Sequence, residues 1–207
     1  MYNNISIINN PISPYKKILI LGYNKNETII FQTLISMNCL IHHTNKQLFK
    51  INDYDLIISF GYRYILGKRL INKTKCPIIN LHISYLPYNR GSHPNFWSFY
   101  DETPSGVTIH LVDEGIDTGP ILYQKYVRFN KREVTFEQTY NKLKKEIELL
   151  FIKKSSKILT HMWVEKPQKG IGTQHNINDL PKNFSGWKSN IRKEIEKLKD
   201  EEHKNEK

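Results

Sequence analysis

A strand-like segment that ends in Asn80-Leu81-His82 carries the residues best suited to chemistry. Asn80 and His82 are two positions apart, so in an extended segment their side chains point to the same face. An amide can donate a hydrogen bond to a carbonyl oxygen, and an imidazole can relay a proton near neutral pH. The pair therefore suits the attack of a nucleophile on a carbonyl group, but it lacks a group that would orient the imidazole.

Asp117 is the candidate for that orienting group. It closes the Asp-Gly pattern of residues 113–117, and the strand-like run of residues 107–113 separates it from His82 in the chain. A carboxylate beside an imidazole favours the charged form of the ring and raises its pKa. The spacing alone leaves the ordinary alternative open, in which polar residues in turns only cap or hydrogen-bond locally.

The elements that must position these residues follow a regular alternation. Short apolar runs at residues 16–23, 39–44, 54–62 and 76–82 predict strands, and residues 27–37 have the apolar spacing of a helix. The alternation predicts an α/β fold, a Rossmann-like and mainly parallel sheet with helices on both faces. In such sheets ligands bind beyond the carboxyl ends of the strands, which is where His82 lies.

The second half of the chain continues with fewer strands and longer helices. Strands are expected at residues 105–114 and 120–129, a short helix opening at Pro94, and a long helix whose start carries a Thr135 and Gln138 capping box. A charged helix over residues 188–207 has Ile191, Ile195 and Leu198 on one face. We predict an N-terminal segment (1–15), a catalytic domain (16–166) and a C-terminal extension of loop and helix (167–207).

The composition sets limits on the class of protein. With 207 residues, 39% hydrophobic and 25% charged, the chain fits one main globular domain. Its apolar runs are too short to span a membrane and its start does not resemble a secretory signal, so we expect a cytoplasmic location and no membrane partner. A net charge of +11 favours anionic partners without choosing one. Cys39 and Cys76 are predicted to be buried free thiols.

Several linked motifs, in the right order, resemble the formyltransferase domain that uses 10-formyltetrahydrofolate. They are Asn80-Leu81-His82, Ser84-Tyr85-Leu86-Pro87 with Arg90-Gly91, Gly106-Val107-Thr108, and the run from Asp113 to Pro120. The resemblance covers about residues 16–160. It implies a formyltransferase fold in which Asn80, His82 and Asp117 match the family's catalytic triad.

The resemblance also implies where the folate lies, against the end of the third strand and the Asp-Gly loop. The expected folate contacts are Phe60, Tyr62, Ile65, Leu66, Asp113, Gly115 and Ile116. The hydrogen-bond donors of the triad would polarise the formyl group, so we expect no metal.

Among the family's branches, the chain is most similar to the short nucleotide-sugar N-formyltransferases. This implies a substrate amine on a dTDP- or GDP-linked amino-dideoxy sugar, and a protein that can form a homodimer. The candidate substrate contacts are Arg63, Asn89, Arg90 and Trp97. For two of them a structural role is the alternative, because Arg90 can hold its loop and Trp97 can belong to the core.

Three alternative functions stay open. Glycinamide ribonucleotide is disfavoured because the phosphate loop of that enzyme is replaced by Gly22-Tyr23-Asn24-Lys25, and methionyl-tRNA because the chain from Pro167 onward is too short for an RNA-binding barrel. A non-catalytic nucleotide or RNA binder would use the basic helices at 142–157 and 188–199. The intact triad weighs against it, so we do not expect a nucleic-acid partner.

Overall fold

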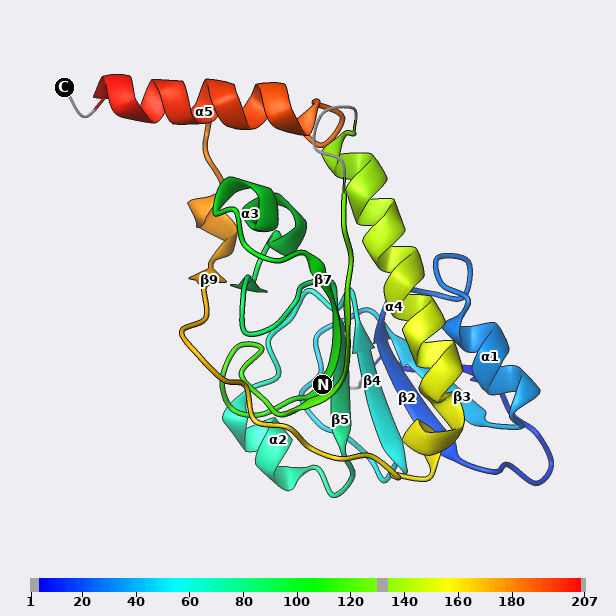
Figure 1. The fold of residues 1–207 in the computed structure, drawn as a ribbon. Coiled ribbons are helices and arrows are strands. Elements are labelled where there is room, and N and C mark those ends of the chain that lie inside the picture. Colours follow the sequence, from blue (N-terminus) through cyan, green and yellow to red (C-terminus); the bar gives the residue numbers. More distant parts are fainter. Residues whose placement is uncertain (1–3, 130–133, 206–207) are drawn as a thin grey trace. The chain divides into compact units, whose positions relative to one another are not determined.

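The structure is a computed structural model that describes residues 4–129 and 134–205. Figure 1 shows the elements along the chain. In order they are β1 (Ser6–Asn9), β2 (Lys17–Gly22), α1 (Ile30–Ser36), β3 (Leu40–Thr44), β4 (Leu56–Phe60), α2 (Lys68–Lys73), β5 (Ile78–His82), β6 (Arg90–Gly91), α3 (Pro94–Tyr100), β7 (Gly106–Leu111), β8 (Ile121–Tyr126), α4 (Phe136–Leu159), β9 (Gln174–His175), a 3₁₀ turn (Ile177–Asp179) and α5 (Ile191–Asn205).

Seven strands form one sheet in the order β1-β3-β2-β4-β5-β7-β8. β2 runs parallel to β3 and to β4, and β4 runs parallel to β5. The predicted α/β fold with a mainly parallel sheet is confirmed. The sequence did not predict β1, a four-residue edge strand that pairs antiparallel with β3.

The chain divides into two compact units. The first comprises residues 1–82, 109–123 and 147–168, and the second residues 83–108, 124–146 and 169–207. The domain boundaries expected after residues 15 and 166 stay a prediction.

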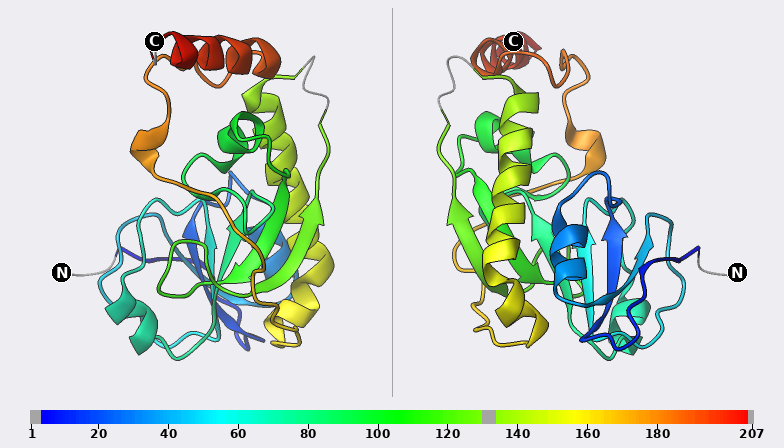
Figure 2. Two further views of the ribbon diagram at one scale, coloured as in Figure 1. Left: turned by 60° about the vertical axis from the view of Figure 1, so that its left-hand side comes forward. Right: turned by 90° about the vertical axis from the view of Figure 1, so that its right-hand side faces the viewer.

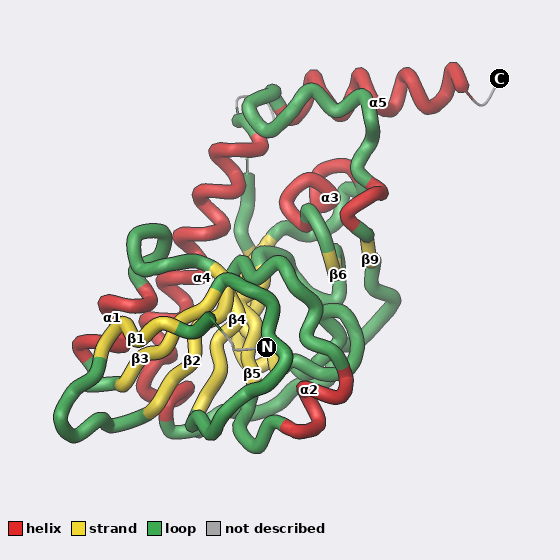
Figure 3. Tube along the Cα trace, turned by 180° about the vertical axis from the view of Figure 1, so that it is seen from behind, coloured by secondary structure: helices red, strands yellow, loops and turns green. Residues whose placement is uncertain are grey.

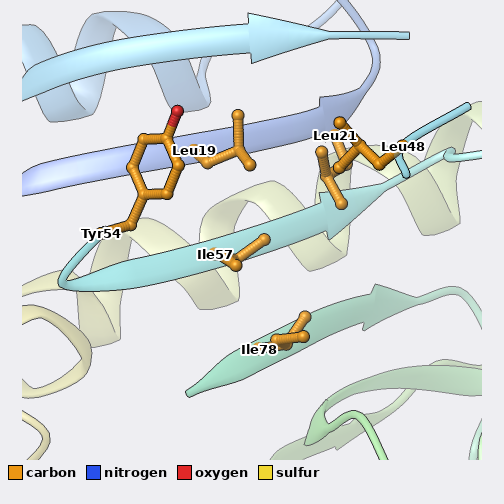
Figure 4. Packing of buried hydrophobic residues seen from close by; sticks show 6 residues of the cluster. All are labelled: Leu19, Leu21, Leu48, Tyr54, Ile57 and Ile78. Carbon is orange, nitrogen blue, oxygen red and sulfur yellow. The ribbon is translucent and has the colours of Figure 1, made fainter. Parts of the chain in front are cut away.

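The first unit has a core on each face of its central strands. Leu19 and Leu21 of β2 join Leu48, Tyr54, Ile57 and Ile78 in one cluster, against which α2 packs its partly buried Leu70 and Ile71. Figure 4 shows the six buried side chains of this cluster on the near face of the strands, with a helix passing behind. Ile18 and Ile20, which alternate with Leu19 and Leu21, are fully buried as well. β2 is therefore covered on both sides, as a central parallel strand requires.

Helices account for that double cover. In Figure 2, α2 (cyan-green) and the C-terminal half of α4 (yellow) lie on opposite sides of the strands of this unit. Apart from β1, the strands of this unit were predicted from the sequence, as was the long helix α4, whereas α2 was not among the elements predicted above.

The two cysteines are free thiols. Cys39 is fully buried, as predicted, whereas Cys76 is only partly buried. Burial is the largest cause that raises the pKa of each thiol to about 11. Both groups are therefore protonated near neutral pH and neither serves as a nucleophile.

The second unit is built around an aromatic core. Phe96, Trp97 and Phe99 of α3 and Phe136 at the start of α4 form this core with residues of α5. Of the predicted apolar face of α5, Ile191 and Leu198 are buried in the core and Ile195 packs against it. Hydrophobic spacing therefore identified the packing face of this helix correctly.

The second unit has a capping box, which the sequence predicted, and a short strand pair, which it did not. The backbone N–H of Thr135 donates to Oε1 of Gln138 at 2.9 Å, and the N–H of Gln138 donates to Oγ1 of Thr135 at 3.2 Å, so the capping box is confirmed. β6 and β9 form a short parallel pair, seen side by side in Figure 3.

None of the helices in the described part of the chain has the length and apolar character of a membrane span.

Candidate active site

The site is built at the carboxyl end of β5, where the sheet presents Asn80 and His82. β5 pairs with β4 in parallel, with Asn80 opposite Ser59. Leu81 between them points the other way and is buried in the protein. The side chain of His82 is only 8% exposed, so its ring sits in a shielded place where charges interact strongly.

Asp117 lies in the loop between β7 and β8. The loop is closed by a hydrogen bond from the N–H of Leu111 to the carbonyl of Pro120 at 2.9 Å. Asp117 has a φ of 52°, a left-handed conformation that Asp and Asn tolerate better than most residues. Nε2 of Gln168 donates to the carbonyls of Asp117 and Gly119 at 2.8 and 2.9 Å. The backbone that carries the carboxylate is thus fixed from two sides.

The carboxylate of Asp117 contacts both polar residues of β5. Nδ2 of Asn80 donates to Oδ1 of Asp117 at 3.0 Å. Nδ1 of His82 lies 3.6 Å from Oδ2 of the same carboxylate, an ion-pair distance that is longer than a hydrogen bond. The structure therefore brings the three predicted residues together, with Asp117 in the orienting position. Their catalytic roles stay a prediction.

His110 of β7 is a fourth member of this cluster, and it was not among the candidate site residues named from the sequence. It is 1% exposed and its Nδ1 lies 2.8 Å from the carbonyl of Leu111, which can only accept, so Nδ1 carries the proton. Its Nε2 lies 3.4 Å from Oδ1 of Asp117 and 3.4 Å from Nδ2 of Asn80. A polar side chain in a buried strand needs a partner, and the imidazole of His110 in the mostly apolar run of β7 was the signal in the sequence.

The predicted folate contacts fall on two segments of the first unit. Phe60 is buried at the end of β4, and Tyr62 and Leu66 pack partly buried against the core cluster described above. Ile65 and Ile116 are the exposed apolar members of the set, with exposed fractions of 78% and 36%. Val112, which precedes the Asp-Gly loop, packs against the same cluster, so both segments border one core.

The Asp-Gly loop is held in shape by its own first residue and by α2. Oδ1 of Asp113 accepts hydrogen bonds from the N–H of Gly115 at 3.1 Å and from Oγ1 of Thr118 at 2.6 Å. Glu114 accepts from Asn72 at 3.0 Å and pairs with Lys68. Hydrogen bonds from Lys68 and Asn72 lower the pKa of the Glu114 carboxyl. The loop is therefore an ordered surface rather than a loose connection.

The predicted substrate contacts are placed differently from one another. Arg63 is exposed on the first unit, whereas the other three belong to the second unit. Asn89 is fully buried, and its amide donates to Oγ1 of Thr103 at 2.8 Å. Trp97 is 6% exposed and its ring stacks on His175 at 3.8 Å between centroids. The contacts of Asn89 and Trp97 are made with other residues of the protein. A contact of Arg63, Asn89, Arg90 or Trp97 with substrate stays a prediction.

Arg90 begins the short strand β6, which the C-terminal segment holds in place. The backbone N–H of Arg90 donates to the carbonyl of Thr173 at 2.9 Å, and that of Ser92 to the carbonyl of His175 at 2.9 Å. His175 in turn contacts Asp101 through Nε2 at 2.7 Å.

Within residues 4–129 and 134–205, no group of three or more His, Cys, Asp or Glu side chains could hold a metal ion.

The chain is similar to known formyltransferases in sequence and in fold. Residues 17–171 match the model of a family described as formyl transferase. In sequence, the chain is 35% identical over 127 residues to a methionyl-tRNA formyltransferase of Thermodesulfovibrio yellowstonii, which covers 60% of the chain and 40% of the relative. It is 39% identical over 75 residues to a dTDP-4-amino-4,6-dideoxyglucose formyltransferase of Mycobacterium bovis, which covers 36% of the chain and 31% of the relative.

A solved structure matches over nearly the whole of both chains. It is the formyltransferase PseJ from Anoxybacillus kamchatkensis, in complex with UDP-4,6-dideoxy-4-formamido-L-AltNAc and tetrahydrofolate. The TM-score is 0.80 at 37% identity, and the match covers 86% of this chain and 96% of PseJ. The chain thus spans less than half of the two curated relatives but almost all of this structural one.

Proposed function

The chain belongs to the formyl transferase family, and we propose that it transfers the formyl group of 10-formyltetrahydrofolate to the amine of a nucleotide-linked amino sugar. The observation that carries the proposal is the single carboxylate of Asp117 that contacts both Asn80 and His82. An amide, an imidazole and an orienting carboxylate together supply what attack of an amine on a formyl group needs.

The choice of an amino sugar as acceptor is supported by the structural match to PseJ. The likeness to PseJ, whose complex holds a UDP-linked formamido sugar, extends over 96% of that protein. The match to the Mycobacterium enzyme adds a second amino-sugar relative. The nucleotide and the position of the amine are left to experiment, and the homodimer and the cytoplasmic location remain predictions.

Asn80 polarises the formyl oxygen in this mechanism. Its Nδ2 donates to Asp117 at 3.0 Å and makes a longer contact of 3.4 Å with His110. The longer contact is the weaker one, so the formyl oxygen can replace it at little cost. A fixed donor aimed at the developing negative charge stabilises the transition state more than it stabilises the ground state.

His82 moves the proton. Its Nδ1 faces Asp117, so in the proposed mechanism Nε2 exchanges a proton with the substrates. As the amine nitrogen bonds to the formyl carbon and the bond from that carbon to the folate nitrogen breaks, His82 takes the proton that the amine loses and returns it to the folate nitrogen. Asp117 stabilises the imidazolium that exists between these two transfers.

The described residues fit a folate beside this cluster. Two segments with exposed apolar side chains, at Ile65 and Ile116, border the same core, and the loop that carries Ile116 is held rigid by Asp113. An apolar surface next to ordered backbone is the usual lining of a site for a flat heterocycle. The folate would supply the formyl group, and these residues would hold it.

The test is a panel of acceptors. Purified protein is mixed with 10-formyltetrahydrofolate and, separately, with UDP-, dTDP- and GDP-linked amino sugars, glycinamide ribonucleotide and methionyl-tRNA, and the products are weighed by mass spectrometry. We expect one amino sugar to gain the mass of one formyl group. Transfer to methionyl-tRNA or glycinamide ribonucleotide alone, or to no acceptor at all, would refute the proposal.

A further inference from the structure

The carboxylate of Asp117 can serve the proposed mechanism only if the backbone that carries it keeps one conformation. Its Oδ2 lies 3.6 Å from Nδ1 of His82, which is already beyond hydrogen-bond length. The groups of a functional site have to be held within about 0.5 Å of their working geometry. A small shift of the loop would therefore separate Asp117 from His82.

Asp117 has a backbone conformation that needs support from its neighbours. Its φ of 52° lies in the left-handed region, which costs a residue with a side chain more energy than the right-handed region does. A residue keeps such a conformation where the contacts around it determine it. Asp113 supplies contacts of this kind, because its Oδ1 accepts from the N–H of Gly115 and from Oγ1 of Thr118. These bonds leave out the carbonyl groups of Asp117 and Gly119.

Gln168 is the partner of those two carbonyl groups. Its Nε2 donates to the carbonyl of Asp117 at 2.8 Å and to the carbonyl of Gly119 at 2.9 Å, so one amide nitrogen uses both of its protons on this loop. The direction of a carbonyl group is set by the ψ angle of its own residue. The first bond therefore fixes the backbone at the residue that bears the carboxylate, and the second fixes the turn that follows.

Gln168 is itself held in place, although it lies 51 residues from Asp117 in the chain. It follows α4 in a segment that pairs with the start of β8. The N–H of Lys166 donates to the carbonyl of Ile121 at 2.9 Å, and the N–H of Ile121 donates to the carbonyl of Lys166 at 2.7 Å. Gln168 is partly buried, and all of these residues belong to the first unit. The amide thus acts from a paired segment rather than from a loose loop.

The use of a side chain here has a consequence that a water molecule would not have. Water could satisfy both carbonyl oxygens, but it would not link them to a paired segment of the chain. An amide carried by that segment holds the loop, and the carboxylate on it, in one place. A defined position is what the counter-charge of an imidazolium needs.

We propose that Gln168 is a positioning residue for formyl transfer, which keeps the carboxylate of Asp117 beside His82 by binding the backbone of the loop. Gln168 touches neither the formyl group nor the amine in this proposal. The inference rests on the proposed function, because it names the residue that sets the geometry of the triad. A role in stability alone is the alternative, and it would leave the properties of His82 unchanged.

The first test measures His82 without folate, amine or transfer. NMR follows the titration of the histidine rings in the wild type, in Gln168→Met and in Asp117→Asn. The signal of His82 among the eight histidines is the one missing from His82→Gln. Methionine is similar to glutamine in length and removes both donors. Gln32→Met, the same change at an exposed position of α1, is the control.

We expect the pH at which His82 binds its proton to shift in Gln168→Met in the same direction as in Asp117→Asn, by a smaller amount. Gln32→Met should titrate like the wild type. His110 also faces this carboxylate, with its Nε2 3.4 Å from Oδ1, so its titration is followed in the same spectra. An unchanged titration of His82 in a folded Gln168→Met protein, or a shift in the opposite direction, would overturn the proposal.

The second test is a double-mutant cycle on the rate of transfer. Gln168→Met is made in the wild-type chain and in Asp117→Asn, and kcat and KM are measured with the acceptor found in the panel. A residue that acts only through Asp117 has no further effect once the carboxylate is gone. We therefore expect kcat to fall about tenfold in the wild-type background and less than about twofold in the Asp117→Asn background, with KM for the amine little changed.

Equal losses of kcat in the two backgrounds would show that Gln168 acts independently of Asp117, which contradicts the proposal. Gln168→Lys keeps a donor at this position and should recover part of the rate that Gln168→Met loses. The NMR titration needs no formyl transfer, so it still tests the role of Gln168 if the acceptor panel finds no product. Normal transfer together with an unchanged titration of His82 in Gln168→Met would refute that role and leave the proposed function standing.

Discussion

Nδ1 of His82 and Oδ2 of Asp117 lie 3.6 Å apart, and the two side chains are only 8% and 14% exposed. The same carboxylate accepts a hydrogen bond from Asn80 at 3.0 Å. One acidic group therefore orients both side chains that would face a formyl group. Its low exposure matters, because a shielded ion pair is less weakened by water and salt than a surface pair.

Replacing Asp117 by Asn keeps its size and removes its charge. We expect kcat for formyl transfer to fall about 10²-fold or more, the scale on which acid–base help is lost, because the imidazolium of His82 loses its counter-charge. Steady-state kinetics on Asp117→Asn measure the effect, with Asp200→Asn on the exposed surface of α5 as control. A kcat close to that of the wild type would show that the carboxylate has no part in the transfer.

His110 acts in this account as a positioning residue for Asp117 and Asn80, to both of which its Nε2 is 3.4 Å away. His110→Phe should lower kcat about fivefold, because one hydrogen bond of about 1 kcal/mol is lost from a buried network. It should also shift the pH dependence of kcat/KM, and His110→Gln should restore part of the rate. A loss of thermal stability with kcat and pH profile unchanged would leave His110 as a purely structural residue.

Gly119 leaves room for the loop that carries Asp117. A Cβ atom at this position would lie 1.9 Å from the carbonyl oxygen of Leu111, a backbone atom that cannot easily move. We expect Gly119→Ala to reduce the free energy of unfolding by about 1–3 kcal/mol, the usual cost of overpacking, and to lower kcat. Urea unfolding measures the first effect. Gly67→Ala is the control, since a Cβ there meets nothing within 4 Å, and equal stability of the two variants would contradict the prediction.

Glu194 ties α5 to the loop that carries Trp187. It is 5% exposed, accepts from the N–H of Ser185 at 2.8 Å and pairs with Lys197 at 2.7 Å. Burial on its own would raise the pKa of Glu194, but the hydrogen bonds from Lys197 and Ser185 outweigh it and hold the pKa below its ordinary value. The carboxylate therefore stabilises the fold above its unfolded pKa of about 4.3 and stops doing so as the pH falls through the lowered folded pKa.

Glu194→Gln should accordingly lower the free energy of unfolding at pH 7 by about 1–3 kcal/mol, the cost of a broken buried hydrogen-bond pair. Urea unfolding of both proteins at several pH values measures the difference, which should shrink as the pH drops below about 4. A difference that is the same at acidic and neutral pH would contradict an ionised role for Glu194.

Much of the fold was readable from the sequence, because local patterns decide it. The apolar runs predicted β2, β4 and β5, and the spacing of Ile191, Ile195 and Leu198 predicted the packing face of α5. The meeting of Asn80, His82 and Asp117 followed from two side chains on one strand face and from the family motifs. The catalytic roles themselves remain a matter for experiment.

What the sequence could not show depends on contacts between distant segments. His110 looked like a packed strand residue, because nothing local revealed that Asp117 and Asn80 would meet it. β1 is a short edge strand that pairs with β3. Because β3 lies far from it along the chain, no local pattern of the sequence revealed this pairing.

The most direct measurement is the single-turnover rate of formyl transfer with His82 replaced. His82→Ala and the more conservative His82→Gln are compared with the wild type and with His203→Ala, a control on the exposed surface of α5, after circular dichroism has confirmed that each is folded. The account predicts a rate about 10²-fold lower or more in both His82 variants and an unchanged rate in the control. Near-normal transfer by a folded His82→Ala or His82→Gln protein would contradict it.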